Sequence, residues 1–241
     1  MNTQWRLLVM ALRFDTRLMS AALEGEEIAD PGAAVRYVPL AGALLGALGG
    51  GVYWLATQLW PTSIAVILSM LATTALSGIT RGTLIAGRPN GESRRNSGLG
   101  AFGMVGVVFA LLLRYNVLMA LSAANVPFAV PANAALGLIM ISGLAASHAL
   151  VVALITSSAR ASSTPVSNAD LSLALGSGLV PAALLGIPGL IGLVAAIVGY
   201  AVFVACLGRD RKAIAGVQLY AAQQLTELCF YLAALASWTY V

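Results

Sequence analysis

The sequence predicts an all-α integral membrane protein, a polytopic bundle of about seven transmembrane helices preceded by an interfacial helix. Hydrophobic residues make up 59% of the 241 positions and charged residues only 9%. A water-soluble domain of this length needs far more charge on its surface. The apolar residues fall into long stretches, and the basic residues gather in alternate connections between them. These observations also lead us to expect one membrane domain over residues 1–241.

Residues 1–34 are predicted to form an interfacial helix followed by an acidic connector. Leu8 and Leu12 recur at helical spacing in residues 1–20, while arginines interrupt the apolar run that a signal peptide would need. Such a helix buries its apolar side in the membrane surface and places its arginines near lipid phosphates. A lid over an active site is the alternative interpretation. The connector is rich in carboxylates up to Asp30 and ends at Pro31.

The apolar stretches that follow are the candidate membrane spans. Crossing about 30 Å of hydrocarbon takes roughly 20 residues in a helix. The fifth stretch is shorter than the others and is interrupted by Gly176, Gly178 and Pro181, so a tilted or partly spanning helix is the alternative there. The stretches are residues 35–60, 62–79, 99–122, 132–156, 171–185, 190–207 and 219–241.

The distribution of basic residues predicts the orientation. With all the stretches spanning, the basic connections fall on one side of the membrane, while the turns near residues 60–61, 123–131 and 186–189 carry no charge. The positive-inside rule therefore places the N-terminus and the basic loops in the cytoplasm. Attraction to membrane lipids explains most of these arginines, and no interleaved basic and aromatic pattern indicates nucleic-acid binding. The expected localisation is the cell inner membrane.

A repeat of small residues marks the first stretch. Gly42, Gly46 and Gly50 recur every four residues and clear a groove for the backbone of another helix. That helix can belong to the same bundle or to a second copy. Close approach of a large flat ligand is the alternative. Cys206 and Cys229 lie in apolar stretches without metal-site spacing and are interpreted as small core residues.

The segment 77–103 is the first candidate site, because it is a glycine-rich polar loop between two apolar stretches. Its sequence is SGITRGTLIAGRPNGESRRNSGLGAFG, with Glu92 as its only carboxylate. Backbone N–H groups of glycine-rich turns at the start of a helix bind phosphate, and arginines strengthen the binding. Attraction to lipid phosphate is the alternative reading. The candidate phosphate-binding residues are Arg81, Arg88, Arg94, Arg95, Asn96, Ser97, Gly98 and Gly100.

Ionisable residues inside the apolar stretches are the second group of candidates, since burying a charge in a membrane is costly. They are Arg114, His148 and Glu227, with Arg160 and Asp170 at the boundaries. Glu227 lies three, four and seven residues after Gln224, Gln223 and Tyr220, so the last stretch presents a polar stripe on one helical face. Glu227 can act in catalysis, or it can simply pair with Arg114 or His148. His148 is also typical of a hydrogen-bonded packing residue.

The order of motifs along the chain resembles the cobalamin 5'-phosphate synthases, also called adenosylcobinamide-GDP ribazoletransferases. The matching stretches are LRFDTRL from Leu12, YVPLAGALLGA from Tyr37, NSGLGAFG from Asn96 and LYAAQQLTELCFYLAALA from Leu219. Together they cover essentially the whole chain. The resemblance implies a multi-span inner-membrane enzyme that joins a GDP-activated corrinoid to α-ribazole or its 5'-phosphate, releases GMP and depends on Mg²⁺.

The resemblance also shows where this chain departs from the family pattern. Where the family carries an Asp-rich stretch, this chain reads SGITRGTLIAGRPNG, and residues 31–91 contain no Asp or Glu. Asn96 and Gln224 stand where the family has Asp and Glu, and only Glu227 keeps its carboxylate. Because Mg²⁺ binds chiefly through carboxylates, we expect weak or no Mg²⁺ binding by the free protein and name no metal ligands.

Two functions remain from the sequence. In the first, the chain is an active ribazoletransferase with Glu227 as catalytic residue and His148, Arg160 and Gln224 adding to the substrate-binding residues of segment 77–103. In the second, it is a catalytically impaired paralogue that serves as a membrane binding or assembly subunit. A corrinoid or nucleotide ligand, a homo-oligomer, and pairing with an active family member are the partners that these alternatives imply.

Overall fold

The computed structural model describes residue 8 and residues 34–77, 101–124, 132–157, 166–207 and 216–240. The described chain is a bundle of α-helices: α3 (Val38–Ala56) after the short 3₁₀ turn η1 (Val35–Tyr37), α4 (Thr62–Leu76), α6 (Ala101–Ala123), α7 (Ala132–Ser157), α8 (Asn168–Leu184), α9 (Ile187–Leu207) and α10 (Gly216–Tyr240). Each helix coincides with one predicted apolar stretch. The all-α membrane fold is therefore confirmed.

Among the described residues, four segments are long and apolar enough to cross a membrane by length and composition: Val35–Ala56, Val105–Ala123, Ala134–Ser157 and Ile187–Leu207. The helix α4 is a shorter apolar helix of 15 residues. The helix α8 has 17 residues with Pro181 inside it, as its interrupted sequence leads us to expect. The last helix, α10, is long enough at 25 residues but carries more polar side chains.

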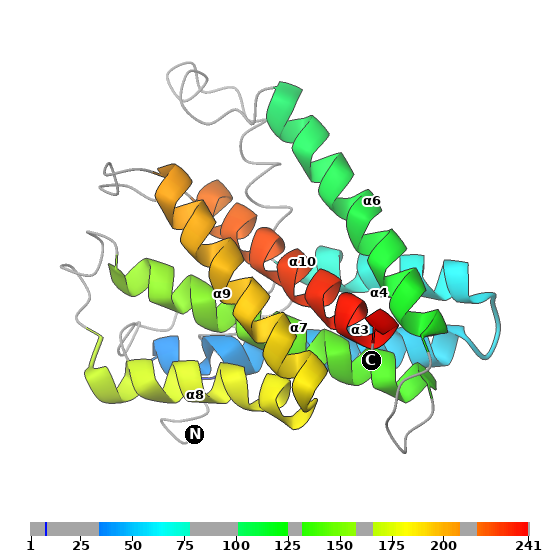
Figure 1. Cartoon of the computed structure of the whole chain (residues 1–241), viewed down its shortest axis with the longest axis horizontal. Helices are drawn as coiled ribbons and strands as arrows, with labels where there is room; N and C mark the ends of the chain where they lie inside the picture. The colour runs from blue at the N-terminus through cyan, green and yellow to red at the C-terminus, as the bar shows by residue number, and fades with distance from the viewer. Residues whose placement is uncertain are drawn as a thin grey trace, which may run out of the picture.

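The helix α7 forms the centre of the bundle, and it packs against α3, α6, α8, α9 and α10. Of the most apolar part of α7, 78% is buried inside the bundle, compared with 17% for α9 and 22% for α6. A helix that is apolar on all sides and rich in small residues suits this central place. Figure 1 shows α9 and α10 side by side, and α6 standing away from the other helices over its amino-terminal half.

The predicted glycine groove is where α3 meets α7. A methyl group added at Gly42 or Gly46 would come within 2.7 Å of backbone atoms of Leu144 or Ile141 in α7. At Gly50 the nearest atom is the Cα of Gly137 at 2.7 Å. The groove therefore serves packing within the bundle, which confirms that alternative.

The turn between α8 and α9 depends on one glycine. Gly186 has a φ of +67°, in the left-handed region that other residues seldom adopt. The N–H of Gly186 donates to the carbonyl of Ala183 at 3.0 Å, closing the end of α8. Because the chain turns back immediately, α9 begins at Ile187 and runs beside α10.

The interpretation of both cysteines as core residues is half wrong. Cys229 lies half-buried against Gly199, where an added methyl group would come within 2.7 Å of its Sγ. Cys206 is exposed on the outer side of α9. Hydrophobicity alone does not separate these places, because a lipid-facing position is as apolar as the core.

Candidate functional site

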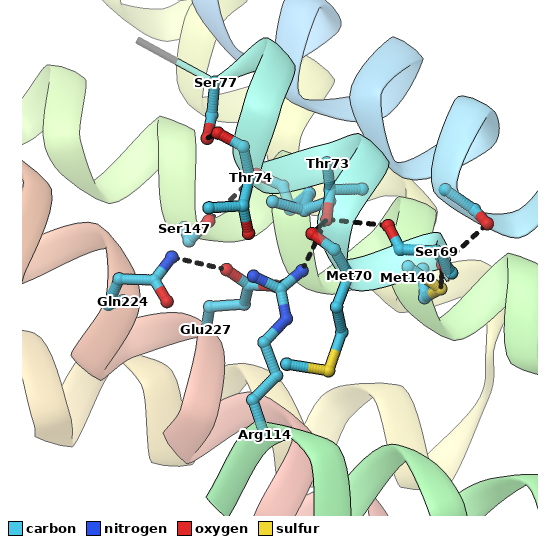
Figure 2. A network of polar contacts seen from close by, with 12 residues as sticks. Ser69, Met70, Thr73, Thr74, Ser77, Arg114, Met140, Ser147, Gln224 and Glu227 are labelled. Carbon is cyan, nitrogen blue, oxygen red and sulfur yellow. Dashed lines mark hydrogen bonds and ion pairs between the residues drawn. The ribbon is translucent and has the colours of Figure 1, made fainter. Parts of the chain in front are cut away.

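A buried ion pair joins α6 to α10 inside the bundle. An Nη2 atom of Arg114 lies 2.8 Å from Oε1 of Glu227, and the two side chains are 3% and 1% exposed. Figure 2 shows the guanidinium and the carboxylate facing each other between the helices. Of the two pairings that the sequence left open for Glu227, the structure forms the one with Arg114.

Neighbouring side chains fix the geometry of this pair. Gln224, one turn before Glu227, donates from Nε2 to Oε2 of Glu227 at 3.3 Å. Arg114 also donates from Nη2 to the hydroxyl of Thr73 in α4, at 3.4 Å. The Thr73 hydroxyl donates in turn to the carbonyl oxygens of Met70 at 3.0 Å and Ser69 at 3.1 Å, within its own helix. Arg114 thus links α4 and α10.

The polar stripe predicted on the last stretch is present on α10. Three polar side chains of α10 are buried, although side chains of this kind are usually exposed to water: Gln223, Gln224 and Glu227. Their spacing of three and four residues places them on the side of α10 that faces the bundle. Glu227 is therefore held in the interior by helix periodicity and by its partners Arg114 and Gln224.

One buried donor of the cluster, Nε of Arg114, lacks a hydrogen-bond partner in the described part of the chain. The hydroxyl of Tyr231, one turn after Glu227, is also buried and lies beside the Glu227 carboxylate. Oε1 of Glu227 also takes no hydrogen bond besides its ion-pair contact with Arg114. Buried polar atoms nearly always form hydrogen bonds in folded proteins, so buried atoms without one call for an explanation.

His148 lies in the interface between α7 and α3. Its Nδ1 is 2.6 Å from the carbonyl oxygen of Leu144, one turn earlier, so Nδ1 carries the proton and donates it. A methyl group at Gly42 would come within 2.5 Å of this nitrogen, so the imidazole occupies the groove that the glycine leaves open. The packing role that the sequence suggested for His148 agrees with this position.

A second ionic contact ties the beginnings of α3 and α8. Nη1 of Arg36, in η1, donates to Oδ1 of Asp170 at 3.2 Å, with side chains 21% and 17% exposed. Ser167 caps α8, because its hydroxyl accepts from the N–H of Asp170 at 3.1 Å. The sequence indicates Asp170 only as a charge at the boundary of an apolar stretch, and its pairing with Arg36 follows from the packing of α8 on η1.

Most of the predicted substrate-binding residues lie outside the described residues, among them all the phosphate-binding candidates of segment 77–103. These are Arg81, Arg88, Arg94, Arg95, Asn96, Ser97, Gly98, Gly100 and Arg160. Of the remaining candidates, Gln224 and Glu227 come together and His148 lies in the interface of α7 with α3. Thr73 was missed, because a threonine near the end of an apolar helix gives no signal beyond ordinary helix capping.

The described residues do not fit a resident Mg²⁺ site. They bring together no group of three or more His, Cys, Asp or Glu side chains. Glu227 already contacts Arg114 and Gln224, and a hard cation prefers several oxygen ligands and repels a guanidinium. We therefore derive no step through a metal held by these residues.

Comparison with known proteins identifies the family. The profile of the cobalamin-5-phosphate synthase family matches residues 7–81. A protein of Leptothrix cholodnii named adenosylcobinamide-GDP ribazoletransferase is 34% identical over 96% of this chain and 95% of its own length. The chain belongs to the adenosylcobinamide-GDP ribazoletransferase family.

Other family members agree with this assignment. The ribazoletransferase of Shewanella amazonensis is 28% identical over 97% of this chain and 96% of its own length. That of Ralstonia nicotianae is 36% identical, but the match spans about half of each protein, 54% of this chain and 55% of the relative. No solved structure matches the chain. Membership of this family connects the chain with cobalamin biosynthesis, and its apolar helices make it an integral membrane protein.

Proposed function

We propose that this chain is an adenosylcobinamide-GDP ribazoletransferase, which joins a GDP-activated corrinoid to α-ribazole or its 5'-phosphate and releases GMP. The observation that carries the proposal is the match to the Leptothrix cholodnii ribazoletransferase along nearly the whole length of both chains. A relation of that extent includes the membrane helices that form the buried polar cluster. It therefore favours a shared reaction over a shared fold alone.

In the proposed reaction Glu227 is the catalytic carboxylate. The attacking hydroxyl of the ribazole gives its proton to Glu227 as its oxygen forms a bond to phosphorus, and the bond from that phosphorus to the departing GMP oxygen breaks. A positioned base of this kind is typically worth 10²–10⁴-fold in rate. Support comes from the burial of Glu227 and from the fixed position of its carboxylate between Arg114 and Gln224.

Charge developing on phosphate oxygens needs cationic or N–H donors. We propose that Arg94 and Arg95 are the cationic donors and that the glycine-rich backbone around Ser97 provides the N–H donors. Mg²⁺ is proposed only as a companion of the substrate's own diphosphate. The remaining substrate-binding candidates of this proposal are Arg81, Arg88, Asn96, Gly98, Gly100, His148, Arg160 and Gln224.

The proposed setting is the cell inner membrane, with the N-terminus and the basic loops in the cytoplasm. The contact between Arg36 and Asp170 supports the seven-span topology, because α3 and α8 then begin on the same side of the membrane. The distribution of basic residues favours the cytoplasm for that side. Single cysteines at Asn125 and Ser163, in a chain freed of Cys206 and Cys229, test it. A membrane-impermeant maleimide added to spheroplasts should label the first and not the second.

Turnover by the purified protein in lipid tests the reaction. Adenosylcobinamide-GDP, α-ribazole 5'-phosphate and Mg²⁺ should yield the joined corrinoid and GMP, and Glu227→Gln should lower kcat by roughly 10² or more. The Leptothrix cholodnii protein serves as positive control. Absence of turnover while the control works would refute the activity, and binding of the corrinoid without turnover would favour a binding subunit. Replacing Arg94 and Arg95 with Ala should weaken binding of the nucleotide-activated corrinoid.

A further inference from the structure

The unusual residue of the cluster is Arg114, because an arginine in the middle of a membrane helix is expensive and marks a function by default. It is also where α6 enters the bundle. From residue 105 onward, the side chains of α6 are exposed or half-buried until Arg114, which is the first buried one. Val117, Leu118 and Leu121 continue the buried face after it. Arg114 thus begins the buried part of a helix whose amino-terminal half stands away from the other helices (Figure 1).

Arg114 also joins the helices on either side of segment 77–103. The helix α4 ends at Leu76 and α6 begins at Ala101, so the two helices flank this segment in the sequence. One guanidinium nitrogen contacts both Thr73 of α4 and Glu227 of α10 (Figure 2). Arg114 therefore ties α4, near its end, to the carboxylate on α10.

The charge of Arg114 also bears on whether Glu227 is a carboxylate or a carboxylic acid. A carboxylate with 1% exposure and no cation beside it would take up a proton, because an unpaired charge in an apolar interior costs far more than a neutral acid. Within the described residues, the amide of Gln224 and the phenols of Tyr220 and Tyr231 also interact with Glu227, and none of these groups carries positive charge. Thr73 faces Arg114 from α4 and is also uncharged.

We infer that Arg114 is a positioning residue of the transfer reaction: it keeps Glu227 ionised and aimed between α4 and α10, so that the carboxylate can accept a proton from the attacking hydroxyl. The inference rests on the proposed function. In a purely structural ion pair, Arg114 would affect only stability. In the inferred role, Arg114 also controls the protonation state of Glu227 and therefore the rate of the reaction.

The test uses the full chain in lipid, with Arg114→Gln, Arg114→Lys and Glu227→Gln. Infrared difference spectra distinguish a carboxylate from a carboxylic acid, and Glu227→Gln assigns the signal. We expect a carboxylate in the wild type and in Arg114→Lys, and a carboxylic acid in Arg114→Gln. With the substrates present, Arg114→Gln should lose kcat by roughly 10² with little change in KM, because a protonated Glu227 cannot accept a proton.

A carboxylate in folded Arg114→Gln, or an unchanged kcat in that variant, would overturn the inference. If Arg114→Gln does not fold, Arg114→Lys decides. Lysine keeps the charge, but its shorter side chain cannot place the ammonium where Nη2 of Arg114 lies between Thr73 and Glu227, so the carboxylate signal should remain while kcat falls. A protonated Glu227 in folded Arg114→Lys contradicts the inference. A wild type without turnover would refute the proposed function only, since the infrared signal tests the control of protonation separately.

Discussion

Gly46 of α3 lies against the backbone of Ile141 in α7, so closely that a methyl group on Gly46 would come within 2.5 Å of the Ile141 Cα. A methyl group and a backbone carbon cannot lie that close, so one of the two helices would have to move. The contact sits in the middle of the glycine groove between Gly42 and Gly50, where α3 and α7 meet. Small residues therefore decide how closely the first predicted span can approach the central helix.

Gly46→Ala should accordingly separate α3 from α7 and destabilise the protein by about 1–3 kcal/mol, as overpacked interiors do. Thermal unfolding in detergent measures this. Gly51→Ala is the matched control, because nothing lies within 4 Å of the added methyl group. The control should leave stability equal or slightly higher, since alanine favours helix. Equal unfolding temperatures for the two variants would contradict the close packing.

The ion pair of Arg114 and Glu227 predicts strong coupling between their substitutions. Replacing Glu227 with Leu leaves the Arg114 charge buried and should cost about 3–5 kcal/mol. Replacing Arg114 with Leu forces the buried Glu227 to take up a proton and should also destabilise the protein. The double variant Arg114→Leu with Glu227→Leu removes both charges and should recover much of that stability. A double-mutant cycle from unfolding midpoints gives the coupling. Additive single effects would show that the two side chains do not pair in the membrane.

The cap of α8 makes a smaller prediction. Ser167 accepts from the N–H of Asp170 at the first turn of the helix, and loss of such a cap costs about 1 kcal/mol. Ser167→Ala should lower the unfolding temperature, whereas Ser172→Ala should not, because that hydroxyl only donates to the carbonyl of Ala169 on an exposed face. The outcome that counts against the cap is an equal shift in both variants.

The two cysteines should differ in their reactivity. Cys206 is exposed near the end of α9, while Cys229 is half-buried against Gly199. A small membrane-permeable maleimide should therefore modify Cys206 faster in the folded protein, and unfolding should equalise the rates. Mass spectrometry of Cys206→Ser and Cys229→Ser variants separates the two sites. Faster modification of Cys229 in the folded state would mean that the face of α9 is assigned wrongly.

The sequence predicts the helices well because the signal is local. In a membrane every backbone N–H and C=O has to be satisfied within the segment, so a long apolar stretch has little choice but to form a helix. The stretch at residues 62–79 corresponds to α4, Thr62–Leu76, and differs only at its end. Stretch 35–60 is too long by four residues, because α3 ends at Ala56 and turns follow it before Pro61.

The sequence predicts the site only in part. It indicates that Glu227 faces inward, because Gln223 and Gln224 share its side of the helix and periodicity needs no knowledge of neighbours. It does not distinguish Arg114 from His148 as the partner, because both lie in apolar stretches. The partner depends on which helix packs against α10 at that level. The polar loop between α4 and α6 carries most of the remaining candidates and lies outside the described residues.

By itself, the sequence determined the class, the helices, the inward polar stripe of α10 and, through its motifs, the likeness to the ribazoletransferase family. These follow from apolar length, helical period and local composition, each of which is written within one segment. Only the tertiary structure decided that α7 is central, that Arg114 rather than His148 holds Glu227, and that Cys206 faces outward while Cys229 does not. Those outcomes depend on how close helices can approach, which small residues such as Gly46 set across pairs of segments far apart in the chain.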